Sequence, residues 1–198
     1  MGRRSDHSRE ELRELILEEG HRQLSEVGFA RFSAREVAKR IGYSIGTIYN
    51  VFGSYDALLL ALNGRTLDVW LAFLEQRLAG REERRLDAAI EAYFDFALGC
   101  RHAWTALYDF RLPEGTPPSQ DYRDKVAAIT GVIVREIAAI LPPGLGGEAL
   151  PLARSLLASV HGHCFFALNG TFAMLGETDP VGAAKARVAD ALARFGAG

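Results

Sequence analysis

Cysteine is scarce in this sequence of 198 residues, and neither basic nor acidic residues are in large excess over the other. The two cysteines, Cys100 and Cys164, each lie inside an apolar run, which indicates buried thiols rather than a disulfide framework and makes the cytoplasm the expected compartment. The formal net charge is only -2, which excludes a tail of one charge sign. With 48% hydrophobic and 24% charged residues, the composition is that of a globular protein with a core.

The sequence also predicts neither a secretion signal nor a membrane-spanning helix. The basic start at Arg3 and Arg4 continues into polar residues, not into the apolar segment of a signal peptide. Residues 155–175 contain no Asp, Glu, Lys or Arg and approach the roughly 20 residues that a bilayer requires. They carry two histidines and an asparagine, however, and no cluster of Lys or Arg flanks them. We therefore expect a buried helix there and no association with a membrane.

Apolar residues recur at helical spacing along nearly the whole chain, and no alternating pattern predicts a strand, so the sequence predicts an all-α fold. Gly20, inside the first helix, costs about 1 kcal/mol against Ala, which predicts a close backbone approach there. Asn63-Gly64 is a hairpin signal, but its flanks keep the helical period and we expect a helix with a bend. The expected helices cover residues 8–27, 33–41, 44–51, 54–78, 86–100, 103–111, 120–141, 148–175 and 179–195.

Local signals mark where the first helices begin and end. Ser8 with Glu11 and Ser33 with Glu36 are Ser-x-x-Glu pairs, the pattern of a capping box at a helix start. Gly42 stands where a left-handed residue ends a helix. Helices 33–41 and 44–51 are therefore separated by a tight turn.

Two short helices joined by Gly42-Tyr43 indicate a helix-turn-helix. In this motif the first helix crosses the phosphate backbone of double-stranded DNA, and the N-terminal residues of the second reach base edges. The pair combines phosphate binders with base readers. Its candidate contact residues are Ser33, Arg35, Lys39, Arg40, Ser44, Ile45, Thr47, Tyr49 and Asn50.

Chemistry assigns roles to these residues. Ser33 caps a helix whose first amides can receive a phosphate, and the Tyr49 phenol can donate to another. Asn50 can pair with an adenine edge, whereas Ile45 and Thr47 offer methyl contacts to thymine. Gly46 lets the backbone approach DNA closely.

Placement of charge, not its total, supports this interpretation. Residues 1–55 hold nine basic and eight acidic residues, so the net charge is small. The basic residues nevertheless gather around the helix-turn-helix. This placement predicts DNA binding that is strongly sensitive to salt and uses few phosphate contacts per subunit. These basic residues are Arg31, Arg35, Lys39 and Arg40, with Arg3 and Arg4 on a free arm.

The segment from Leu12 to Leu60 resembles the signature of the tetracycline-repressor (TetR) family. The resemblance implies a dimeric, ligand-responsive, all-α transcriptional regulator, and it implies DNA contacts by Ser33, Thr47 and Tyr49. Val51 stands where the family usually has His. Tyr55 stands where the family usually has a phosphate-contacting Lys, and it is kept as a candidate DNA contact. The matching motifs are Gly28-Phe29, Ser33-Ala34-Arg35-Glu36-Val37-Ala38, Gly42-Tyr43-Ser44-Ile45-Gly46-Thr47-Ile48-Tyr49 and Phe52-Gly53-Ser54.

Farther along, Ser159-Val160-His161-Gly162 is similar to the Trp-His-Gly signature of one C-terminal subgroup of the family, with Val160 in place of Trp. This half is also rich in aromatic residues. Most are simply core, but a helical bundle whose core carries a few polar tips is typical of a pocket for a small, largely apolar ligand. The candidate ligand-binding residues are Trp70, Tyr93, Phe96, Trp104, Tyr108, Arg111, His161 and Phe165.

Two other patterns point to chemistry that the context does not favour. Gly42-Tyr43-Ser44-Ile45-Gly46 matches the G-x-S-x-G elbow of hydrolases, which requires a buried strand before the serine. His161, His163 and Cys164 could suggest zinc ligands, but His163 points away from the helix face that the other two share. We expect no enzyme, no metal and no cofactor.

The sequence thus predicts a helix-turn-helix DNA-binding domain over residues 1–53 and an effector-binding and dimerisation domain over residues 54–198. The expected function is that of a repressor that binds a palindromic operator as a homodimer and is released by a small effector. Helices 148–175 and 179–195, which carry small residues such as Ala184, would pack against their symmetry mates. A transcriptional activator and a ligand-binding protein of the same fold remain alternatives.

Overall fold

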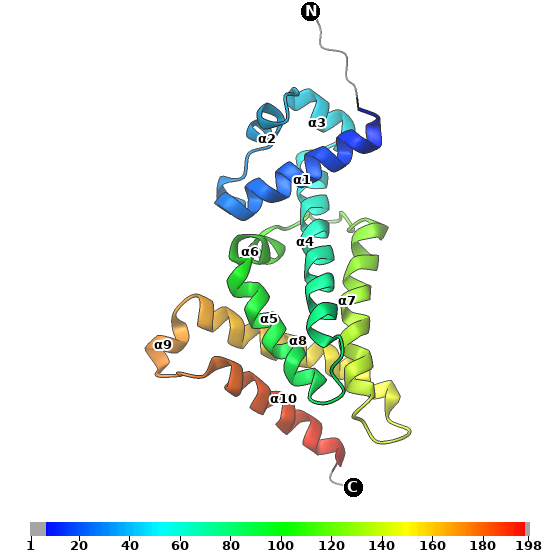
Figure 1. The fold of residues 1–198 in the computed structure, drawn as a ribbon, viewed down its shortest axis with the longest axis vertical. Coiled ribbons are helices and arrows are strands. Elements are labelled where there is room, and N and C mark those ends of the chain that lie inside the picture. Colours follow the sequence, from blue (N-terminus) through cyan, green and yellow to red (C-terminus); the bar gives the residue numbers. More distant parts are fainter. Residues whose placement is uncertain (1–6, 197–198) are drawn as a thin grey trace, which may run out of the picture. The chain divides into compact units, whose positions relative to one another are not determined.

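The computed structural model describes residues 7–196, and every regular element in that range is helical, which confirms the all-α class. Two of the elements are single 3-10 turns, η1 (Phe29–Arg31) and η2 (Gly146–Glu148). The α-helices labelled in Figure 1 are α1 (Arg9–Val27), α2 (Ala34–Arg40), α3 (Ile45–Phe52), α4 (Tyr55–Leu78), α5 (Arg85–Gly99), α6 (Arg101–Asp109), α7 (Gln120–Ala138), α8 (Ala149–Leu168), α9 (Thr171–Leu175) and α10 (Pro180–Gly196).

The chain divides into two compact units, and neither is a single continuous stretch of sequence. The first unit contains the described residues up to Val69 together with Cys100–Lys125. The second contains Trp70–Gly99 and the residues from Val126 onward. This division differs from the expected boundary after residue 53, because the first part of α4, all of α6 and the start of α7 belong with the N-terminal helices.

The core of the first unit is built from the apolar faces of α1 to α4, with Ala106 and Phe110 added from α6 and its C-terminal end. Ile16, Val37 and Ile48 are fully buried in it. A Cβ atom added at Gly20 would lie 2.9 Å from Leu62 Cδ2. The structure therefore confirms the close approach expected at this glycine and shows that α4 is the neighbour.

Asn63 explains why α4 stays helical through its hairpin-like Asn-Gly pair. Its buried side-chain amide donates a hydrogen bond to the carbonyl of Ala106, at 3.2 Å, and so joins α4 to α6. An added Cβ at Gly64 would touch the Lys125 side chain at 3.4 Å, so the glycine leaves room for α7. Tertiary contacts thus use both residues of the pair within a continuous helix.

The two expected capping boxes turn out differently. At Ser8 both bonds form: its hydroxyl accepts from the amide of Glu11, and the Glu11 carboxylate accepts from the amide of Ser8. Ser33 accepts from the amide of Glu36, at 3.3 Å, but the reciprocal bond is absent. The amide of Ser33 instead donates to the buried Gln23 of α1, at 2.9 Å. The second box is therefore half formed, because a residue from another helix takes over the acceptor role.

In the second unit, α10 packs against α5 and α8, and buried side chains from all three helices form its core. The expected helix over residues 148–175 is wrong in one respect, because it is broken into α8 and α9. Gly170 adopts a left-handed conformation, with φ at 80°, and the Asn169 side chain accepts from the amide and hydroxyl of Thr171. These local bonds replace helical ones at the break.

Among the described residues, α4 is the one helix long and apolar enough to cross a membrane, and half of that stretch is buried inside the protein. A core helix passes the same test of length and composition.

Candidate nucleic-acid interface and ligand cavity

The turn between α2 and α3 depends on Gly42, whose φ of 77° is left-handed, as its position predicts. The amide of Tyr43 donates back to the carbonyl of Ala38, at 2.8 Å, and closes the end of α2. Ser44 then caps α3 by accepting from the amide of Thr47, at 3.2 Å. Two helices are thereby joined through a short, hydrogen-bonded turn, which is the geometry of a helix-turn-helix.

The helix α3 has one buried face and one open face. Ile48 is fully buried and anchors the helix to the core of the first unit. Tyr49, with 40% of its surface exposed, and Asn50 face outward. Thr47 and Ile45 are half-buried, and the Thr47 hydroxyl is hydrogen-bonded to that of Ser44 at 3.0 Å. This bond leaves the methyl group as the free contact of Thr47.

Two of the candidate phosphate donors, Ser33 and Tyr55, come from different helices: Ser33 caps α2, and Tyr55 is the first residue of α4. The ring of Tyr55 lies 6.1 Å from that of Phe32, the residue that precedes the cap Ser33. Burial raises the pKa of Tyr55, and the nearby Tyr49 and Asp56 raise it further. Tyr55 is therefore a neutral phenol that can donate a hydrogen bond. The Ser33 oxygen accepts from an amide, so its hydroxyl hydrogen also stays available to an anion.

The bases around the motif differ in how far they are neutralised. Arg40 pairs with Glu26 at 3.0 Å, with Glu19 at 3.2 Å and with Glu36 at 3.4 Å, and hydrogen bonds to these carboxylates raise its pKa. Arg35 and Lys39 are exposed and form no ion pair with any residue in the range 7–196.

The other expected bases are Arg31, Arg3 and Arg4. Arg31 donates to the carbonyl of Val27, at 3.1 Å, and so closes the end of α1. Arg3 and Arg4, expected on a free arm, lie outside the described residues.

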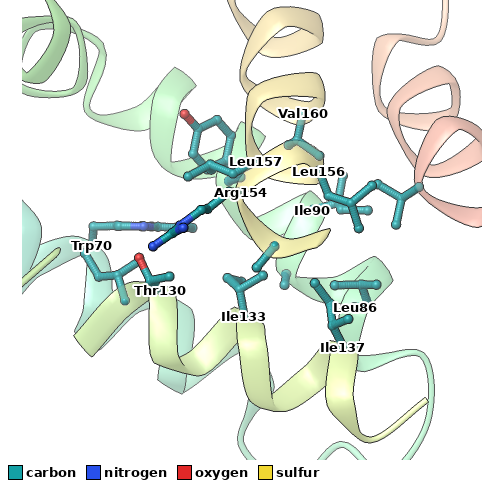
Figure 2. A pocket seen from close by; sticks show the side chains of 15 residues that line it. Trp70, Leu86, Ile90, Thr130, Ile133, Ile137, Arg154, Leu156, Leu157 and Val160 are labelled. Carbon is teal, nitrogen blue, oxygen red and sulfur yellow. The ribbon is translucent and has the colours of Figure 1, made fainter. Parts of the chain in front are cut away.

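The second unit contains an apolar cavity between its helices. Figure 2 shows side chains from α7 and α8 pointing into it, with Trp70 of α4 at one end and Leu86 of α5 toward the other. The empty space, counted with its open mouth, is about 700 Å³. The cavity is lined by Trp70, Leu86, Ala89, Ile90, Tyr93, Ile129, Thr130, Ile133, Ile137, Ala153, Arg154, Leu156, Leu157, Val160 and Val188.

A chain of rings stands behind one wall of this cavity. The rings of Trp70 and Tyr93 meet edge to face, with centroids 5.6 Å apart. The Tyr93 hydroxyl lies 2.9 Å from Nδ1 of His161, and burial lowers the pKa of this histidine. His161 in turn stacks on Phe165. Tyr93 is thus held in one orientation by α8.

The expected ligand-binding residues are distributed over three kinds of place. Trp70 and Tyr93 line the cavity. Phe96, His161 and Phe165 lie behind these two residues. Phe96 packs on Trp70, His161 is hydrogen-bonded to Tyr93, and Phe165 stacks on His161. The other three residues belong to the first unit instead: Trp104, Tyr108 and Arg111.

Sequence reasoning missed Arg154, which is part of the cavity wall. Its signal is present in the sequence: it is the only Asp, Glu, Lys or Arg within α8. Periodicity does not single out Thr130 either, because this residue lies on an ordinary amphipathic helix.

The alternative chemistries find little support in the geometry. Gly42-Tyr43-Ser44-Ile45-Gly46 joins two helices, and the described range 7–196 has no strand before the serine. No three His, Cys, Asp or Glu side chains within that range are grouped so that they could hold a metal ion. Burial raises the pKa of Cys164 to about 12, which makes its thiol a poor nucleophile.

Comparison with solved structures shows the same fold in proteins of low sequence identity. A protein of unknown function from Rhodococcus sp. RHA1 is 24% identical, with a TM-score of 0.73, and the match covers 98% of this chain and 99% of that one. The multidrug binding protein EbrR, complexed with imidazole, is 18% identical, with a TM-score of 0.63 and coverage of 94% and 96%.

NalD, the secondary repressor of the MexAB-OprM multidrug efflux pump in Pseudomonas aeruginosa, is also 18% identical, with a TM-score of 0.51 and coverage of 96% and 97%. No curated protein sequence matches the chain.

Family models match both parts of the chain. Residues 16–62 match the model of bacterial regulatory proteins of the tetR family, and they include the helix-turn-helix. Residues 86–192, more than half of the chain, match the tetracyclin repressor-like C-terminal domain. Together with the all-α fold and the exposed recognition helix, these matches show that the chain belongs to the tetracycline-repressor (TetR) family of transcriptional regulators.

Proposed function

We propose that this protein is a repressor that binds a palindromic operator as a homodimer and releases it when a small, largely apolar effector binds. The observation that carries the proposal is α3, which is anchored by Ile48 and presents Tyr49 and Asn50 to solvent. A short helix with one anchored face and polar readers on the other can enter the major groove.

Within this proposal the contact residues divide into two sets. Ser33, Arg35, Lys39, Tyr49 and Tyr55 hold phosphates and set the orientation of the protein. Base edges are read by the second set, because its members project from the first two turns of α3. These readers are Ser44, Ile45, Thr47 and Asn50.

Exposed apolar side chains on α8 and α9 support a homodimer. Leu157 and Phe165 of α8 are each more than two-fifths exposed, and Met174 of α9 is 81% exposed. A surface this apolar is typical of an interface. Ala184 of α10 is fully buried within the single chain, so it does not belong to the face that meets a partner.

A two-fold axis would place the recognition helices about 34 to 36 Å apart, one turn of DNA, and so implies a palindromic site. Effector release requires a ligand that binds better to a dimer with another spacing. α4 suits this coupling, because it begins three residues after α3 and carries Trp70 of the cavity wall. Operator DNA must then weaken effector binding by the same factor.

The decisive experiment is selection of a bound sequence from random DNA, followed by gel shifts. Thr47→Ala, Tyr49→Phe and Asn50→Ala should each weaken binding to the selected site, by about 1 to 3 kcal/mol for a residue that reads a base. Gln76→Ala, an exposed neutral change on α4, is the matched control and should have no effect. Wild-type protein that selects no sequence would refute the proposal.

A reporter gene placed behind the selected site separates repression from the activator alternative. Repression predicts higher expression when the protein is deleted, and lower expression contradicts it. A ligand-binding protein of this fold without a regulatory role predicts no change.

A further inference from the structure

We infer that the cavity of the second unit binds an apolar carboxylic acid and that Arg154 holds the carboxylate. The inference rests on the proposed function, because it assigns the chemical class of the effector. It depends on how charge and apolar surface are distributed over the cavity wall.

Arg154 is the cation of this wall. It is the only Asp, Glu, Lys or Arg of α8, and it forms no ion pair with any residue that the structure describes. Figure 2 shows its guanidinium end reaching toward Trp70 and Thr130. Arg154 is exposed, so its guanidinium lies where the cavity wall meets solvent. A planar guanidinium matches a carboxylate with two parallel hydrogen bonds.

No acidic residue lines the cavity, so its wall has a net positive charge. Two carboxylates elsewhere in the second unit have other partners: Glu136 pairs with Arg85 at 2.7 Å, and Asp95 pairs with Arg77 at 2.6 Å. An anionic ligand would therefore supply the counter-charge that Arg154 does not receive from these carboxylates. A cationic ligand would meet repulsion and find no carboxylate to pair with.

The other polar groups of the wall have local partners. The Thr130 hydroxyl donates to the carbonyl of Val126, at 2.8 Å. The Tyr93 hydroxyl is bonded to His161. Neither group competes with Arg154 as a donor to a ligand anion, so the arginine is the polar anchor that remains.

The remaining wall suits an apolar tail. On α7, Thr130 lies near Arg154, and the lining continues through Ile133 to Ile137, a distance of about 10 Å at 1.5 Å per helical residue. Leu86 continues the apolar surface toward the far end, and Val188 is also part of the apolar lining. One charged end and one long apolar end fit a molecule with a carboxylate head and a hydrocarbon tail.

Calorimetric titration of the full-length protein with three probes that share a ten-carbon chain tests the inference. The probes are decanoate, decanol and decyltrimethylammonium, all below their micelle concentrations. Wild-type protein should bind decanoate about tenfold or more tightly than decanol. One charge-assisted hydrogen-bonded pair accounts for a difference in affinity of this size. It should bind the cationic probe most weakly. Equal binding of decanoate and decanol would overturn the inference.

Substitutions then assign the effect to Arg154. Arg154→Gln should remove the preference for decanoate and leave decanol binding unchanged, whereas Arg154→Lys should retain part of the preference. Arg135→Gln is the matched control, because Arg135 is an exposed arginine of α7 outside the cavity wall. A preference that survives Arg154→Gln, or that Arg135→Gln removes equally, contradicts the role of Arg154.

The test is independent of the operator. Decanoate binding is measured without DNA, and operator binding is measured by gel shift without ligand. Protein that selects an operator but does not prefer decanoate refutes the ligand class alone. Protein that prefers decanoate but selects no DNA refutes the proposed function and leaves the ligand class standing.

Discussion

Arg40 is held by Glu26: its Nη1 atom lies 3.0 Å from the Glu26 Oε2 atom. Glu19 and Glu36 complete the set of carboxylates around the same guanidinium, whose pKa is raised by these hydrogen bonds. Arg40 follows Lys39 directly in the sequence, yet only Lys39 remains without an ion pair to the described residues. The pair joins α1 to the helix-turn-helix and neutralises one of the cations around that motif.

This relationship predicts different salt dependences for neighbouring bases. Lys39→Gln or Arg35→Gln should each lower the slope of log affinity against log salt by about 1, because each base that binds a phosphate releases counterions. Arg40→Gln should leave the slope unchanged and lower the melting temperature instead, because it removes a link between helices. Operator affinity measured over a series of KCl concentrations gives the slopes. A reduced slope in Arg40→Gln would contradict the assignment.

The apolar face of α8 predicts a variant that separates dimerisation from folding. Phe165→Asp should shift the protein from dimer to monomer, because it places a charge in an apolar interface. Leu98→Asp is the control, since Leu98 is 64% exposed on α5 and should leave the dimer intact. Light scattering after gel filtration measures the mass. A wild-type monomer, or a Phe165→Asp dimer, contradicts the proposed interface.

Crowding at Gly20 predicts that a larger side chain at this position lowers the stability of the protein. Helix propensity alone does not predict this loss. Gly20→Val should lower the free energy of unfolding by about 1 to 3 kcal/mol, because its side chain would overlap Leu62 in the core. Gly46→Ala should not destabilise the protein, because its added Cβ would lie 3.6 Å from Ser44 Oγ, an ordinary separation. Urea unfolding of both variants gives the comparison. Equal stability of Gly20→Val and wild type would show that Leu62 moves aside.

The half-buried pair of His161 and Tyr93 predicts a pH dependence of stability. Burial lowers the pKa of His161 below 6.5, so the folded state binds a proton less readily than the unfolded state. The contribution of neutral His161 to the free energy of unfolding is therefore complete above pH 6.5. It is lost as the pH falls through the folded-state pKa of His161.

His161→Gln should flatten this dependence. The measurement is urea unfolding at neutral pH and at successive values below 6.5, the ordinary histidine pKa. His21→Gln provides an independent comparison, because burial and the nearby Arg65 lower the pKa of His21 as well. Identical pH profiles for wild type and His161→Gln would contradict the assignment to this residue.

Local patterns predicted most of the fold, since periodicity and caps act over one or two helical turns. Such signals predict the left-handed Gly42, the two reciprocal hydrogen bonds between Ser8 and Glu11, and the crowded Gly20. The break at Gly170 was missed because apolar spacing continues across it, while the local bonds of Asn169 end the helix.

The exposed face of α3 and the cavity differ in the same way. Tyr49 and Asn50 could be predicted because a short helix between Ser44 and Gly53 has one apolar face and one polar face. The cavity residues come from helices far apart in sequence, and periodicity shows only that each faces a core. Aromatic content therefore suggested Trp104 and Tyr108, which belong to the first unit, and overlooked Arg154.

By itself the sequence determined the helical class, the turn between α2 and α3 and the exposed face of the recognition helix, because these depend on residues within a few positions of one another. Only the tertiary structure decided which bases remain available to DNA and which side chains enclose the cavity. Both depend on partners distant in sequence: Glu19 and Glu26 neutralise Arg40, and α8 brings Arg154 to the wall that Trp70 and Tyr93 form.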